Sequence, residues 1–149
     1  MQRQPAGREA VRVSVLAVEL HGVIGKLKRR LREEAHVGDL TSSQAAVLRR
    51  LDREGPVTVT TLAKAEGVRP QSMGATVSAL EAAGLVAGAA DPHDGRQTMW
   101  SLTPACRRMI KESRATREDW LFRAIQEHLS ADEQAELAIS IELLKRLVD

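Results

Sequence analysis

Aromatic residues are scarce in this chain of 149 residues, which has no tyrosine, one phenylalanine and two tryptophans. Because an all-β core usually depends on aromatic and β-branched side chains, this scarcity favours a helical fold. No run of about 18 apolar residues occurs, so the sequence predicts no membrane span. Residues 1–12 lack the apolar stretch of a signal peptide, and we therefore expect a cytoplasmic protein.

Cysteine is almost absent too, and the single Cys106 excludes both an internal disulfide and a multi-cysteine zinc site. Cys106 lies near the start of an expected helix, where the helix dipole favours the thiolate. A redox switch is therefore one interpretation and a buried, inert thiol is the other, which we favour because it is the commoner case.

The motifs of common enzymes are missing as well. The sequence has no phosphate-binding glycine loop, no G-x-S-x-G and no metal-spaced histidine pair. Its four histidines are scattered: His21, His36, His93 and His128. We therefore expect no catalytic activity, no cofactor and no metal. The crowded turn "DPHDGR" offers poor geometry for a metal ion, and a polar turn is the simpler interpretation.

The composition that is present fits one globular domain, because hydrophobic residues make up 43% of the chain. The net charge of +2 is modest, and its distribution along the chain is informative. Residues 1–40 hold eight Lys/Arg against five Asp/Glu, residues 41–103 hold six of each, and residues 104–149 hold eight against nine. No segment is a basic tail, so charge alone does not indicate a nucleic-acid-binding protein.

Helical spacing of apolar residues predicts a first helix over residues 8–35. Thr41 and Gln44 form a capping-box pattern that opens a second helix. We expect Thr60 to cap a short third helix that Gly67 ends, and Pro70 to open a fourth. "LVAGAA" and "TMWSL" then read as two strands on either side of the charged turn.

Two helices are expected in the rest of the chain. One begins at Thr103 and Pro104 and runs to about residue 129, and Ser130 with Glu133 caps the other. The last helix carries apolar residues at a and d spacing: Leu137, Ile141, Leu144 and Val148. The terminal helices have more apolar surface than the central segment can cover, which predicts a partner subunit.

Four ordered motifs resemble the MarR family of bacterial transcriptional regulators: "LTSSQAAVLRRL", "TTLAKAEGV", "SALEAAGLV" and "DPHDGRQTMWSLT". The resemblance implies a mainly α fold with a small β-hairpin wing, in one MarR-like domain over residues 1–149. Within it, residues 8–35 and 104–149 are expected to be dimerisation helices. Residues 41–103 are expected to be the winged helix–turn–helix DNA-binding unit of a homodimeric repressor that binds an inverted-repeat operator in double-stranded DNA.

The resemblance also assigns roles to residues. Pro70–Ala83 is expected to be the recognition helix in the major groove, and the wing is expected to enter a minor groove. Arg96 is the cation that would enter that groove, with Asp94 holding its guanidinium. The remaining base or edge contacts are expected from Arg69, Gln71, Ser72 and Ser78.

This chain also departs from the family. It has no Lys or Arg between Pro70 and Gly84, and it has Gly74 and Ala75 where many members carry Thr-Arg. Cys106 replaces a usual glycine. The alternative function is therefore a winged-helix protein–protein interaction module with weak or lost DNA binding.

The family usually places a small-molecule effector between the dimerisation helices and the DNA-binding unit. The candidate cavity walls here are Leu20, His21, Ile24 and Trp100. A histidine on an apolar helix is more often a core or interface residue than a ligand-binding one, and both interpretations of His21 stay open.

Overall fold

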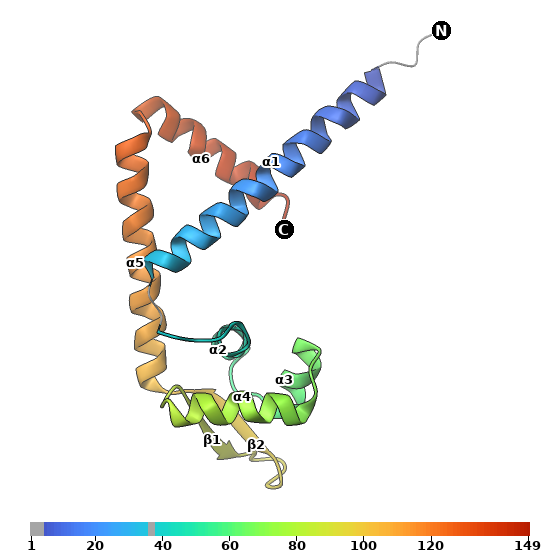
Figure 1. Ribbon diagram of the computed structural model, residues 1–149, viewed down its shortest axis with the longest axis vertical. Coiled ribbons are helices and arrows are strands. Elements are labelled where there is room, and N and C mark those ends of the chain that lie inside the picture. Colours follow the sequence, from blue (N-terminus) through green and yellow to red (C-terminus); the bar gives the residue numbers. More distant parts are fainter. Residues whose placement is uncertain (1–4, 36–37) are drawn as a thin grey trace. The chain divides into compact units, whose positions relative to one another are not determined.

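The computed structural model describes residues 5–35 and 38–149, which form six helices and one two-stranded antiparallel hairpin (Figure 1). The mainly helical fold with a β-hairpin wing is therefore confirmed. The chain divides into two compact units. One lies within residues 37–114, and the other combines residues 1–36 with residues 115–149. Each unit is described separately below.

The first unit begins with α2 (Ser42–Glu54), whose expected capping box is present. The Thr41 hydroxyl accepts from the Gln44 backbone N–H at 3.1 Å, and the Gln44 side chain accepts from the Thr41 backbone N–H at 3.0 Å. Gly55 ends the helix at a φ of 82°, a conformation that glycine adopts without steric cost.

The cap of α3 (Val59–Glu66) corrects one expectation. Thr58, not Thr60, is the N-cap, and its hydroxyl accepts from the Thr61 backbone N–H at 3.2 Å. Thr58 has the extended backbone that an N-cap needs, whereas Thr60 already lies inside the helix. The preceding Val57 forms a β-bridge with Trp100, which fixes the point where the chain can turn into the helix.

A tight turn joins α3 to α4 (Pro70–Ala82). Gly67 adopts the left-handed conformation, with a φ of 67°, and the Val68 N–H donates to the Ala63 carbonyl at 3.0 Å. This is a Schellman ending, which satisfies carbonyls that the helix end leaves free. Pro70 follows in the first turn of α4, where its missing N–H costs nothing.

The hairpin consists of β1 (Val86–Ala90) and β2 (Thr98–Leu102), paired from Val86 with Leu102 to Ala90 with Thr98. It follows α4 directly in the chain (Figure 1). The core of the unit takes apolar side chains from its helices, from the hairpin and from the start of α5 (Pro104–His128). Its largest fully buried side chains are Leu62, Leu80, Val47, Val77, Val86 and Cys106.

The second unit contains α1 (Pro5–Glu34), the later part of α5, and α6 (Ala131–Lys145). The expected capping box of Ser130 and Glu133 is present at the start of α6. α6 ends at Lys145, so Val148 lies beyond the helix rather than in its last turn. No helix within residues 5–35 and 38–149 is long and apolar enough to cross a membrane.

Candidate nucleic-acid interface

α4 presents one face to the core and another to solvent. Met73, Val77 and Leu80 are buried, at the spacing of an inward-facing helical stripe. The exposed positions that lie away from this stripe are Gln71, Ser72, Ala75, Ser78, Ala79 and Ala82. At about 100° per residue, they cover roughly a third of the helix circumference. This surface is continuous and free for contact with a partner.

The exposed face of α4 carries mostly small side chains, none of them charged. The helix carries no Lys or Arg, and Glu81 is its single ionisable residue. Three residues that the sequence nominated for base contact, Gln71, Ser72 and Ser78, lie together on this face and are exposed. Arg69 is the N-cap residue immediately before α4 and is exposed, so its guanidinium lies at the helix start.

Two aspartates organise the tip of the hairpin. Asp91 Oδ1 accepts from the His93 backbone N–H at 2.9 Å, and Asp94 Oδ1 accepts from the Arg96 backbone N–H at 3.1 Å. Each is an Asx turn, in which a side chain takes the place of a backbone acceptor. Backbone bonds between Asp91 and Gln97, at 2.9 Å, and between Gln97 and Asp94, at 3.0 Å, close the turn.

The role of Asp94 thus differs from the one expected. In the described turn its carboxylate binds the backbone of Arg96 rather than the guanidinium, because the short aspartate side chain reaches the N–H two residues ahead. The Arg96 side chain is exposed at the tip. Asp94 therefore shapes the loop that carries Arg96 and leaves the cation free to meet an anion.

The Trp100 ring packs over Gly88 of the neighbouring strand. The two residues are directly opposite in the register. A Cβ placed on Gly88 would lie 2.7 Å from Thr98 Cγ2 and 3.2 Å from two atoms of the Trp100 ring. Trp100 is half-buried and packs against the core. The absence of a side chain at Gly88 therefore allows Trp100 to connect the wing to the body of its unit.

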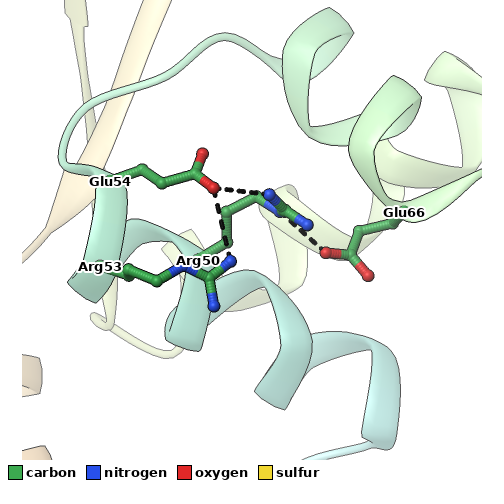
Figure 2. Close-up of polar contacts among 4 residues, drawn as sticks. All are labelled: Arg50, Arg53, Glu54 and Glu66. Atoms are coloured by element: carbon green, nitrogen blue, oxygen red, sulfur yellow. Dashed lines mark hydrogen bonds and ion pairs between the residues drawn. The ribbon is translucent and has the colours of Figure 1, made fainter. Parts of the chain in front are cut away.

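An ion-pair cluster connects α2 and α3 (Figure 2). Arg50 Nη1 lies 2.6 Å from Glu54 Oε1, and Arg50 Nε lies 2.9 Å from Glu66 Oε1. The hydrogen bond to Glu66 is the largest of the effects that raise the pKa of Arg50. Arg53 also approaches Glu54, at 3.4 Å. Arg50 thereby ties the end of α2 to the end of α3.

Sequence reasoning missed this cluster. The Arg50 and Glu54 pair is readable as an i,i+4 contact on one helix. Glu66 lies 16 residues from Arg50, and no local pattern connects them.

Thr103 joins the end of α4 to the start of α5. Its hydroxyl donates to the Gly84 carbonyl at 2.7 Å and accepts from the Cys106 backbone N–H at 3.1 Å. The Cys106 side chain is fully buried, and this burial is the main cause that raises the pKa of its thiol. The dipole argument for a thiolate is thus outweighed by desolvation, and the structure favours the inert thiol.

The candidate effector residues are divided between the two units. Leu20, His21 and Ile24 lie on α1, where His21 and Ile24 are exposed, and Trp100 belongs to the other unit. Two of the hollows among the described residues are lined by none of these four side chains. One, of about 280 Å³, is lined by residues of α2, α3 and α4 and by Val68. The effector cavity stays a prediction.

The second hollow, of about 490 Å³, lies between α1 and α5 within the second unit. Its Arg30 stacks over Trp120, 5.6 Å from the ring centroid, and pairs with Glu34 at 2.9 Å. This arginine is therefore already engaged by the protein.

No three His, Cys, Asp or Glu side chains among residues 5–35 and 38–149 gather in a way that could hold a metal ion. Two of the histidines, His21 and His128, belong to one unit, and His93 belongs to the other. His36 lies outside the described residues.

Comparison with known proteins decides the family. The family model described as "MarR family" matches residues 38–97. An HTH-type transcriptional regulator of Mycobacterium tuberculosis is 33% identical over 134 residues, which cover 90% of this chain and 93% of the relative. This chain belongs to the MarR family of transcriptional regulators.

Solved structures agree with this assignment. A protein of Pseudomonas aeruginosa, described as a transcriptional regulator, is 39% identical with a TM-score of 0.80, and the match covers 93% of this chain and 96% of that one. A mutant of MepR from S. aureus shares the fold, with a TM-score of 0.69 at 16% identity over 90% of this chain and 98% of that one. That MepR structure is bound to an oligodeoxyribonucleotide. The relatives from Mycobacterium tuberculosis and Pseudomonas aeruginosa are both described as transcriptional regulators.

Proposed function

We propose that this MarR-family regulator is a homodimeric repressor that binds an inverted-repeat operator through α4 and the wing. The observation that carries the proposal is the exposed, partner-free face of α4 beside an ordered turn that displays Arg96. In a winged helix–turn–helix, these are the surfaces that meet the major groove and the phosphates or the minor groove. Asp94 supports the proposal by shaping the loop under Arg96.

Dimerisation is supported by the apolar surface of the second unit. Many large apolar side chains of α1 and of the α6 region are exposed in the single chain: Val11, Val13, Val15, Leu16, Val18, Val23, Ile24, Leu27, Ile139, Ile141, Leu143, Leu144, Leu147 and Val148. Soluble monomers rarely expose large apolar patches, so this number of exposed apolar side chains favours a covered surface. A second copy of the chain would remove them from water, and a two-fold dimer of this kind binds half-sites about one turn of DNA apart.

We further propose that a small molecule modulates DNA affinity, with Leu20, His21, Ile24 and Trp100 as candidate contacts. The chemistry of these side chains supports this proposal, because an aromatic ring, two aliphatic groups and one histidine suit a mainly apolar ligand with one polar group. Isothermal titration with a panel of aromatic acids, followed by the same titration of His21→Ala, tests this part separately.

The second candidate function is a protein–protein interaction module. The observation that favours it is the lack of any basic residue on α4. Nuclease protection of the DNA beside the protein's own gene separates the two functions. Protection of a palindrome with half-sites about 10 bp apart supports the repressor. Uniform cleavage at all protein concentrations, with a folded dimer present, supports the interaction module.

A further inference from the structure

The chemistry of the exposed face of α4 indicates which base pairs it can distinguish. In the major groove, guanine is read chiefly by Arg or Lys and cytosine by Asp or Glu, whereas adenine is read by Asn or Gln. α4 has no Arg or Lys, and its single carboxylate, Glu81, lies in its last turn. The N-terminal part of the helix, which reaches the bases in this type of motif, therefore has no Arg, Lys or carboxylate that would single out a G·C pair.

The groups that are present suit the other pair. Gln71 lies exposed in the first turn of α4, where its amide can donate to N7 and accept from N6 of one adenine. Ala75 lies one turn further along on the same face, and Ala79 one turn beyond that. Their methyl groups match the C5-methyl group of thymine, which is the one apolar feature on the major-groove edge.

The other polar groups of this face add no competing preference. Ser72 and Ser78 are exposed, and a serine hydroxyl can serve any base. The Thr76 hydroxyl is directed back to the Ser72 carbonyl at 3.2 Å, so it is occupied within the helix. Arg69 precedes the helix, and as an N-cap residue it is placed to meet a phosphate at the edge of the half-site.

We infer that α4 selects A·T base pairs, with Gln71 reading adenine and the methyl groups of Ala75 and Ala79 packing against thymine methyl groups. This inference rests on the proposed function, because it requires α4 to enter the major groove. It assigns specificity to hydrogen bonding and methyl packing, and it leaves attraction to the phosphates to residues outside α4.

The experiment begins with selection of duplexes from a randomised library by the full-length protein. We expect the enriched half-sites to be A·T-rich. The best duplex is then titrated in a fluorescence-anisotropy assay beside one in which deoxyuridine replaces the half-site thymines. Removing one buried methyl group should weaken binding about fourfold. Deoxyuridine placed only in the flanking sequence is the control and should leave the affinity unchanged.

Three variants sharpen the test. Gln71→Ala should reduce the preference for adenine at one position of each half-site about tenfold. Ala75→Arg should move the preference at its own position to guanine. Ala65→Arg adds the same charge on α3 and is the matched control, which should increase affinity for all duplexes without changing the selected sequence. Ala65 and Ala75 are both exposed.

Two results would overturn the inference while leaving the proposed function intact. One is enrichment of half-sites rich in G·C pairs, and the other is equal affinity for the thymine and deoxyuridine duplexes. A protein that enriches no sequence and protects no operator would refute the proposed function as well.

Discussion

Substitution of Gly88 by alanine tests the packing that connects the wing to its unit. The added Cβ would lie 2.7 Å from Thr98 Cγ2 and 3.2 Å from the Trp100 ring. A separation of 2.7 Å is well inside the optimum of about 3.5–4.0 Å for two carbon atoms. Thr98 is β-branched and restricted at χ1, so relief requires a shift of the strand or of the indole.

Overpacking of this kind costs about 1–3 kcal/mol. We expect the lower half of that range, because Thr98 is exposed and can move outward. Urea denaturation followed by circular dichroism, at one fixed protein concentration, should therefore show a lower midpoint for Gly88→Ala with an unchanged slope.

A second substitution makes the explanation specific. Thr98→Ser deletes Cγ2 and keeps the hydroxyl, so it removes the 2.7 Å contact and leaves the contact with Trp100. The double variant should recover part of the lost stability, whereas Thr98→Ser alone should change little. If Gly88→Ala is as stable as the wild type, or if Thr98→Ser restores nothing in its presence, the steric argument is refuted.

Three further predictions concern DNA binding, assembly and the thiol. Arg96→Ala should weaken operator binding by about 1–3 kcal/mol per site in anisotropy titrations while leaving the melting curve unchanged. Asp94→Ala should weaken binding less, because the Asp94 carboxylate holds only the Arg96 backbone. Replacing Leu137 and Leu144 with aspartate should abolish the dimer in analytical ultracentrifugation, and a wild-type monomer at micromolar concentration would contradict the proposed assembly. Burial raises the pKa of the Cys106 thiol in the folded protein, so the stability that the protonated thiol contributes is complete below the unfolded thiol pKa of about 8.5 and is lost as pH rises through the folded-state pKa. The Cys106→Ala variant should lack this loss of stability at alkaline pH. Peroxide should release neither the wild type nor the variant from DNA.

The sequence was most informative where a structure depends on neighbours in the chain. The capping boxes at Thr41 and Ser130 are present because both partners of each box lie within four residues. The position of the wing was likewise readable from a proline, a glycine and two aspartates between β-prone segments.

Prediction was less successful where distant residues decide. Thr58 and Thr60 are equally good caps in the sequence, and the bridge between Val57 and Trp100 determines which one is used. The bond between Arg50 and Glu66 depends on the packing of two helices. Asp94 has two acceptable partners in Arg96, the guanidinium and the backbone N–H, and the geometry of the turn selects the second.

The uncharged face of α4 also affects how such a protein would be distributed in a cell. Affinity for arbitrary DNA comes almost entirely from cations that displace counterions from phosphates. If α4 enters the major groove as we propose, it contributes none of this attraction, because it has no Lys or Arg. The chromosome would then hold fewer copies in unproductive complexes, and a small pool of protein would suffice to occupy one operator.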